Sequence, residues 1–116
     1  MKRLILIVFV VMLAFPATVS AEDTCCVTMM DVTAERVKGG VLVEWETAME
    51  LWYIGYNVLM ERNGKLVQLN DDLIQAEHPG ELIGAAYQYR VRGHRRAIFW
   101  IEVVRYDFET ETWRAR

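Results

Sequence analysis

The chain lacks several residue types on which enzymes depend. No serine follows Ser20, which excludes a Ser-His-Asp triad unless threonine replaces the serine. Only two histidines, His78 and His94, are present, and their spacing is not that of metal ligands. The one glycine pair, Gly39-Gly40, reads as a turn rather than a phosphate-binding loop. We therefore expect no catalytic residue, no metal site and no cofactor.

Cysteine is also scarce, because Cys25 and Cys26 are the only two and they are adjacent. Adjacent cysteines cannot form an ordinary bridge across a fold, so the core must rest on packing. Three arrangements are compatible with the pair. One thiol is buried as a small hydrophobe while the other is inert, or the two form a vicinal disulfide, or they pair with another chain.

The chain has no excess of basic residues, since 13 Lys and Arg face 16 Asp and Glu. Nonspecific nucleic-acid binding needs a basic surface, so nucleic acid is not expected as a partner. There is also no internal repeat, low-complexity tract or linker, and no sustained helical periodicity. Only 47–52 and 71–77 are compatible with a turn or two of helix.

Residues 1–21 have the features of a secretory signal peptide. The basic pair Lys2-Arg3 precedes an unbroken apolar run over 4–15, and Pro16 ends the run. The residues Val19-Ser20-Ala21 suit cleavage by a signal peptidase. We predict a mature chain that begins at Glu22.

The apolar run is shorter than the roughly 17–25 residues that a membrane-spanning helix needs. We therefore expect no stable membrane insertion after cleavage, and a secreted or periplasmic location. Residues 22–116 are enough for one small core and not for two domains.

Two strands in the first half are indicated by alternation of apolar residues. In 41–46, Val41, Val43 and Trp45 share one face; in 54–61, Tyr56, Val58 and Met60 share another. Period-2 alternation of this kind is typical of half-buried strands. Gly55 inside the second strand indicates a bend or a close backbone approach, and Asn63-Gly64 predicts the turn that ends it.

The second half contains two further strands. Residues 87–92 alternate cleanly between apolar and polar side chains. Residues 97–105 are apolar almost throughout, as in a central strand, with Phe99, Ile101 and Val103 on one face. Trp100 on the opposite face would form an apolar patch with Leu59 and Leu42 if those strands pair.

Shorter β segments are expected at 28–37, 65–69 and 112–114, which makes about seven in all, and Leu73, Ile74 and Ala76 give a short apolar segment. This pattern predicts an all-β fold, an antiparallel two-sheet sandwich of about seven strands, with a small barrel as the alternative. We expect five side chains at the centre of the core: Trp45, Tyr56, Val58, Phe99 and Ile101.

These strands resemble a fibronectin type III domain over roughly residues 27–114. Val41–Trp45 is similar to that family's second strand, Ile54–Val58 to its third, and Phe99–Val103 to its sixth. A narrower likeness is to modules of secreted bacterial proteins, carried by Trp45-Glu46-Thr47-Ala48, Gly55-Tyr56-Asn57-Val58, Asn70 and Leu73-Ile74. The resemblance implies an immunoglobulin-like β-sandwich.

Two positions depart from the family pattern. Ala97 stands where the family usually places a tyrosine whose hydroxyl ties the corner to backbone. Asp107-Phe108-Glu109 replaces the Asp-Gly turn that the family has before the last strand. We therefore expect no tyrosine tie at this corner and a short last strand.

Candidate binding residues fall in two groups. Trp52 and Tyr53, expected in the loop between the second and third strands, either stack on a ligand or fold under as a cap over the core. The second group is a basic cluster formed by Arg92, Arg95 and Arg96 together with Arg90 and His94, and it either faces an acidic partner or stays solvated.

The carboxylates of Glu44 and Glu46 share one strand face, which reads as a solvated face or as a carboxylate pair. The function that follows is a non-enzymatic interaction or structural module with a protein or glycan partner. The alternative is a small carbohydrate-binding module that uses Trp52 and Tyr53.

Overall fold

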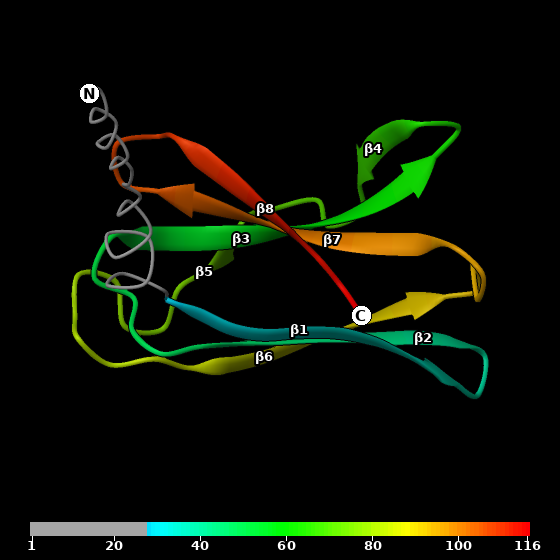
Figure 1. The fold of residues 1–116 in the computed structure, drawn as a ribbon, viewed down its shortest axis with the longest axis horizontal. Helices are drawn as coiled ribbons and strands as arrows, with labels where there is room; N and C mark the ends of the chain where they lie inside the picture. Colours follow the sequence, from blue (N-terminus) through cyan, green and yellow to red (C-terminus); the bar gives the residue numbers. More distant parts are fainter. Residues whose placement is uncertain (1–27) are drawn as a thin grey trace, which may run out of the picture.

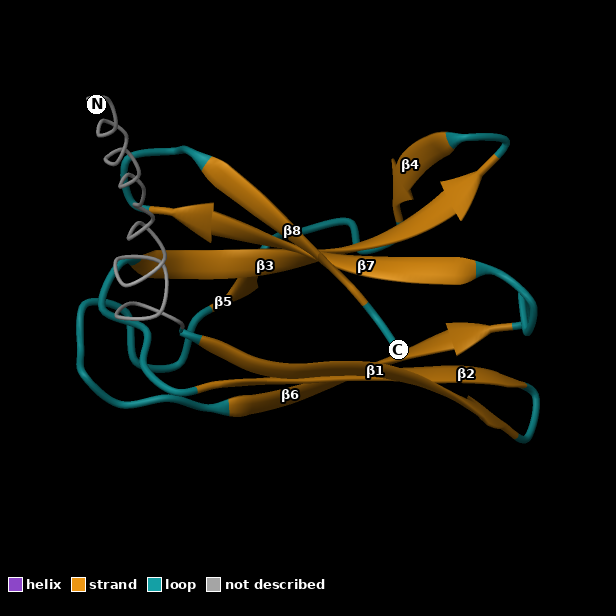
Figure 2. Cartoon of the chain, in the orientation of Figure 1, coloured by secondary structure: helices purple, strands orange, loops and turns teal. Residues whose placement is uncertain are grey.

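The computed structural model describes residues 28–116 and shows an all-β fold in two antiparallel sheets (Figures 1 and 2). The predicted fold class is thereby confirmed. The predicted signal peptide, its cleavage before Glu22 and the pair Cys25-Cys26 lie outside the described residues. The strands are β1 (Met29–Val37), β2 (Gly40–Thr47), β3 (Tyr53–Arg62), β4 (Lys65–Gln68), β5 (Ile74–Gln75), β6 (Ala86–Arg92), β7 (Ile98–Arg105) and β8 (Thr110–Arg114).

The sheets form two layers, which Figure 1 shows one above the other. One sheet has three strands in the order β1-β2-β6. The other has the order β4-β3-β7-β8, with the short β5 also paired to β3. The predicted central strand, β7, lies between β3 and β8. In the described part of the chain, no helix is long and apolar enough to cross a membrane.

The core lies between the layers and consists of the residues that alternation placed there. All five expected core side chains are at most 2% exposed. Trp45 and Tyr56 come from different sheets and pack with ring centroids 5.7 Å apart, while Val58 faces Ile101 in the β3–β7 pairing. Burial of apolar surface is the main favourable contribution to such a fold, at about 25 cal/mol per Å².

Gly55 lies where β3 is approached most closely by another segment. A Cβ atom at this position would lie 2.7 Å from the carbonyl oxygen of Ile74, so only glycine allows β5 to pair here. The pairing of β3 with β7 also shifts register between Tyr53 and Gly55. The expected close approach at Gly55 is confirmed.

Between β4 and β5, the side chain of Asn70 is the hydrogen-bond partner of β3 in place of a neighbouring strand. The buried Asn70 accepts a hydrogen bond from the Val58 amide (2.7 Å) and donates to Asn57 (2.8 Å). Asn57 in turn donates to Glu102 on β7 (2.9 Å). This polar chain satisfies groups that the break between β4 and β5 would leave unpaired.

The C-terminal residues connect the two sheets along one side of the sandwich. The Ala115 amide donates to Phe99 of β7 (2.9 Å). The next residue, Arg116, donates to Val32 and accepts from Ala34, both on β1 and both at 3.0 Å. Part of the open edge of β1 is thereby paired, which removes a site for unwanted strand addition.

Several sequence-based expectations are corrected. Tyr53 is the first residue of β3 rather than a loop residue. Residues 47–52 and 71–77 contain no helix. Leu59 does face Trp100 across β3 and β7, but Leu42 pairs with Arg90 in the other sheet. The expected patch of Trp100, Leu59 and Leu42 therefore does not exist, because alternation within a strand does not say which sheet the strand joins.

The same substitution at a buried and at an exposed phenylalanine tests the packing. We expect Phe99→Ala to cost about 3–5 kcal/mol, because it leaves a cavity in the core. Phe108→Ala, at a side chain that is 79% exposed, is expected to change the free energy of unfolding by no more than about 0.5 kcal/mol. Urea unfolding monitored by circular dichroism measures both, and equal losses would contradict this core.

Candidate functional site

Glu50 is a charged side chain in the interior, with 0% of its surface exposed. Its Oε2 accepts hydrogen bonds from the hydroxyls of Tyr56 (2.5 Å) and Tyr87. Its Oε1 accepts from the backbone amide of His78 (2.8 Å). A buried carboxylate is tolerated only when its oxygens are satisfied, and here three donors surround it.

The backbone of Glu50 is engaged as well. Its amide lies 3.2 Å from the Glu81 carbonyl and 3.1 Å from the Ile83 carbonyl, and its own carbonyl accepts from Gly80 (3.0 Å). Residue 50 thus joins the loop between β2 and β3 to the loop between β5 and β6. Two connections are held in one arrangement around a single residue.

Tyrosine rings surround this carboxylate and link the two sheets. Tyr87 stacks on Trp45 at 5.3 Å and lies 4.8 Å from Tyr56. Burial, and then the hydrogen bond to Glu50, raise the pKa of both Tyr56 and Tyr87 well above the ordinary value of 10.0. Burial likewise raises the pKa of Tyr53 to about 12, and its hydroxyl is bonded to that of Thr28.

The turn between β7 and β8 presents an unusual phenylalanine. The Phe108 amide donates to Arg105 (2.9 Å), the Arg105 amide donates to Glu109 (2.9 Å), and Phe108 has a φ of 68°. Hairpins of this kind normally place glycine at the left-handed position. A phenylalanine there costs on the order of 1 kcal/mol, yet its ring is 79% exposed and gains little from burial.

Phe108 belongs to a group of exposed apolar residues that we call the loop-end patch. Its members lie on the two connections that flank the 48–52 loop: Leu82 (72% exposed), Ile83 (51%), Tyr106 (61%) and Phe108 (79%). The Tyr106 amide donates to the Trp52 carbonyl (3.0 Å), and the residues around Ile83 bond to Glu50. Figure 1 shows these connections together at one end of the sandwich.

The structure packs both residues of the predicted pair, Trp52 and Tyr53, against the core, to different extents. Tyr53 is 2% exposed, so its ring cannot stack on a ligand. Trp52 is half-buried and packs against the core. Both follow the capping alternative because Tyr53 starts β3 with its side chain directed inward.

The predicted basic cluster lies at the opposite end, in the connection from β6 to β7 and just before it. Arg92, Arg95 and Arg96 are all exposed. Arg95 donates to the Val37 carbonyl (2.6 Å), and its own carbonyl accepts from Arg36 (2.9 Å). These bonds attach the connection to the turn between β1 and β2 and add Arg36 to the cluster.

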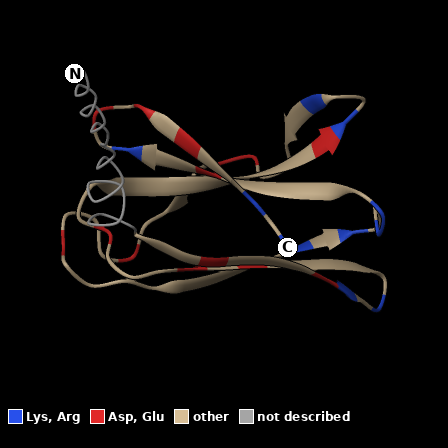
Figure 3. Ribbon diagram, in the orientation of Figure 1, with Lys and Arg blue, Asp and Glu red and all other residues tan. Residues whose placement is uncertain are grey.

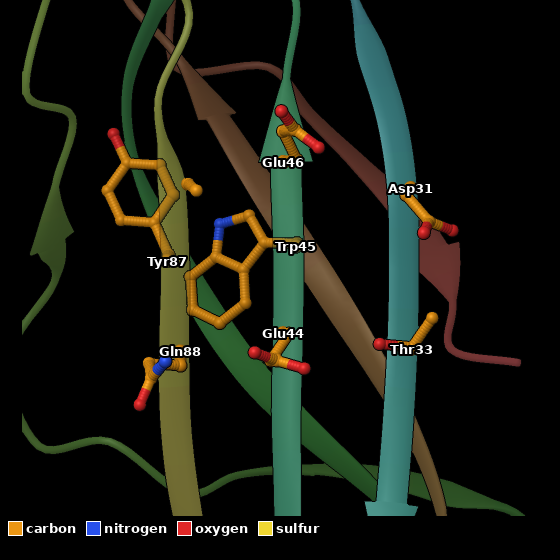
Figure 4. A pocket seen from close by; sticks show the side chains of 8 residues that line it. Asp31, Thr33, Glu44, Trp45, Glu46, Tyr87 and Gln88 are labelled. Carbon is orange, nitrogen blue, oxygen red and sulfur yellow. The ribbon is translucent and has the colours of Figure 1, made fainter.

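A hollow of about 250 Å³ is formed on the three-stranded sheet (Figure 4). Its lining includes the carboxylates of Asp31, Glu44 and Glu46, and Asp31 lies opposite Glu46 in the β1–β2 pairing. Glu44 and Glu46 therefore belong to a wider acidic face than either strand alone indicates. Within residues 28–116, no group of three or more potential ligands is arranged to hold a metal ion.

Comparisons with known proteins assign no relatives. No family model, no curated protein sequence and no solved structure matches the chain.

Sequence reasoning missed Glu50 and the loop-end patch. The signal for Glu50 was a lone acid in the apolar stretch Ala48–Trp52, together with tyrosines whose hydroxyls need an acceptor when buried. The signal for Phe108 was an aromatic residue in the position where a hairpin turn usually has glycine.

Replacing the carboxylate of Glu50 by an amide tests its role. In Glu50→Gln the amide NH₂ must face either the tyrosine hydroxyls or the His78 amide, which are all donors to Glu50. We expect a loss of about 2–3 kcal/mol in the free energy of unfolding. Glu81→Gln, at an exposed acid in the same loop region, is the control and is expected to have almost no effect. Equal stability of both variants would disprove the role.

The buried tyrosines predict a loss of stability in alkali. A tyrosine in the unfolded chain titrates near pH 10, whereas the folded pKa of Tyr53 is about 12. Above about pH 10 the unfolded state releases protons that the folded state keeps, so the free energy of unfolding falls by about 1.4 kcal/mol per pH unit for each such tyrosine. The contribution of such a tyrosine to the free energy of unfolding is fully present below about pH 10, and it is lost as the pH rises toward the pKa of the folded state.

Urea unfolding at about pH 8, 10 and 11 measures this dependence. Tyr53→Phe is expected to flatten it, because one titrating group is removed. A free energy of unfolding that stays constant over the same range would contradict the raised values.

Proposed function

We propose that the protein is a secreted or periplasmic, non-enzymatic interaction module that contacts a macromolecular partner through the loop-end patch. The observation that carries the proposal is Phe108, an exposed aromatic residue held in a backbone conformation that disfavours it. Local strain that the fold does not need is often kept for function.

The rest of the patch supports this interpretation. Exposed loops on a rigid sandwich are frequent recognition sites, and clustered apolar side chains on a surface indicate a partner. Four large apolar residues are exposed on the β5–β6 and β7–β8 connections, and each connection is attached to the 48–52 loop by a backbone hydrogen bond. A surface fixed before binding loses little conformational entropy when a partner arrives.

We infer that the module is fibronectin type III-like. The sandwich architecture supports the inference, as do the buried positions of Trp45, Tyr56 and Val58 on the strands that carry the resemblance. Ala97 cannot supply the corner tie of the family, but Tyr56 and Tyr87 bond to Glu50 and fix a connection by the same kind of contact.

The alternative of a carbohydrate-binding module through Trp52 and Tyr53 is not favoured. Sugar recognition by stacking needs exposed ring faces, and Tyr53 is 2% exposed.

The substitution Phe108→Gly separates binding from folding. Glycine relieves the left-handed strain but adds conformational freedom to the unfolded chain, and the two effects largely offset each other, so we expect the free energy of unfolding to stay within about 0.5 kcal/mol of the wild type. Loss of the exposed ring is expected to reduce partner capture about tenfold. The measurement is chemical crosslinking in the native host, followed by mass spectrometry, with urea unfolding of the purified variants alongside.

The matched control is Phe108→Tyr, which keeps both the ring and the strain. It is expected to retain the partners and to leave stability unchanged. Undiminished capture by Phe108→Gly would refute a binding role for this turn.

A further inference from the structure

Charge is segregated along the length of the sandwich, as Figure 3 shows. The turns at one end carry mainly basic, exposed residues: Arg36, Lys38, Arg62, Lys65, Arg92, Arg95 and Arg96. The connections at the other end, which hold the loop-end patch, carry mainly exposed acids: Glu77, Glu81, Asp107 and Glu109. The two ends of the same molecule are therefore electrostatically complementary.

A hollow near the basic end is lined by arginines, and we call it the arginine hollow. It measures about 220 Å³ and its apolar lining includes Val41, Phe99 and Ala97. Its charged lining consists of arginines only: Arg36, Arg95, Arg114 and Arg116.

The charges around the arginine hollow are largely uncompensated. Arg116 pairs with Asp31, but within residues 28–116 no carboxylate forms an ion pair with Arg36, Arg95 or Arg114. Arg36 and Arg95 are also held in place by hydrogen bonds to backbone carbonyls. The surface thus combines positive charge held in place with a small apolar base, because Val41 and Phe99 at its bottom are 2% and 1% exposed.

The turn between β7 and β8 carries features complementary to those of the arginine hollow, namely an exposed aromatic ring and acidic side chains. Phe108 projects from it with a 79% exposed ring, and the acids Asp107 and Glu109 stand on either side. Asp107 lies 3.6 Å from Arg105 of its own turn, while Glu109 has no ion-pair partner among the described residues. The arginine hollow is open to solvent, and its volume of about 220 Å³ exceeds the roughly 150 Å³ of an enclosed cavity that accommodates benzene.

We call Asp107-Phe108-Glu109 the acidic tip. The acidic tip and the arginine hollow of one molecule cannot contact each other. The hollow includes Ala97–Phe99 where β7 begins, and the tip follows Arg105 where β7 ends. A strand of this length separates its ends by roughly 25 Å.

We propose that the partner of the loop-end patch is a second copy of this chain, with Phe108 of one copy seated in the arginine hollow of the next. This inference rests on the proposed function, because it names the occupant of the same patch. Asp107 and Glu109 would then lie beside the arginines of the hollow. The contact is head-to-tail and leaves one tip and one hollow free, so further copies add to form open chains or closed rings.

The test is sedimentation velocity of the purified protein, whose N-terminus is defined by mass spectrometry. At low salt we expect the wild type to grow beyond a dimer as its concentration rises from about 10 μM to 1 mM. Added salt is expected to reverse the growth, because exposed charges are screened over about 8 Å at physiological ionic strength. Phe108→Gly, and separately the double variant Arg95→Glu/Arg114→Glu, are each expected to weaken association about tenfold or more.

Mixing the two variants gives the decisive result. Phe108→Gly keeps an intact hollow and the double arginine variant keeps an intact tip, so the mixture is expected to form a dimer and to stop there. The control Arg62→Glu/Lys65→Glu changes the same number of charges at the same end but outside the arginine hollow, and is expected to associate like the wild type.

A wild type that stays monomeric at about 1 mM in low salt, or a control that loses association equally, would overturn the inference. If the monomeric protein still crosslinks to a host protein through Phe108, self-association is wrong while the proposed function stands. If Phe108→Gly changes neither measurement, both are wrong.

Discussion

A single buried carboxylate determines the shape of the end of the molecule that bears the exposed apolar residues. Glu50 accepts hydrogen bonds from two tyrosine hydroxyls, one on each sheet, and from the backbone of the loop between β5 and β6. Removal of a charge from water is expensive unless its oxygens are satisfied. The sandwich therefore has to keep all of these donors in place together, and both connections are attached to the core at Glu50.

This arrangement explains how short sheets carry a defined surface without a bridge across the core. The tyrosine rings fill the space between the layers, while their hydroxyls satisfy the acid. The Trp52 carbonyl, two residues beyond Glu50, accepts from Tyr106. The position of the β7–β8 turn is thereby linked to the same centre, and the strain at Phe108 is borne by a turn that is anchored on both sides.

The alternation of apolar residues in the sequence was sufficient to predict most of the strands, but it could not predict the site around Glu50. Alternation located β2, β3, β6 and β7, because burial of one strand face is written into successive residues. It could not tell that Leu42 and Trp100 belong to different sheets, because sheet membership depends on contacts distant in sequence. Glu50 was missed for the same reason, since its donors are up to 37 residues away. The acidic tip and the arginine hollow are each visible as charges in the sequence, but only the fold places them at opposite ends.

The central claim is that Glu50 makes the loop end as firm as the sheets, and native-state hydrogen exchange tests it most directly. The amides to follow are those of His78 and Gly80, which donate to the side chain and to the backbone of Glu50. We predict that both exchange only through global unfolding, with the same protection as the Val58 amide in β3. Exchange of the two loop amides at the rate of an open, unprotected loop, while Val58 stays protected, would contradict the account.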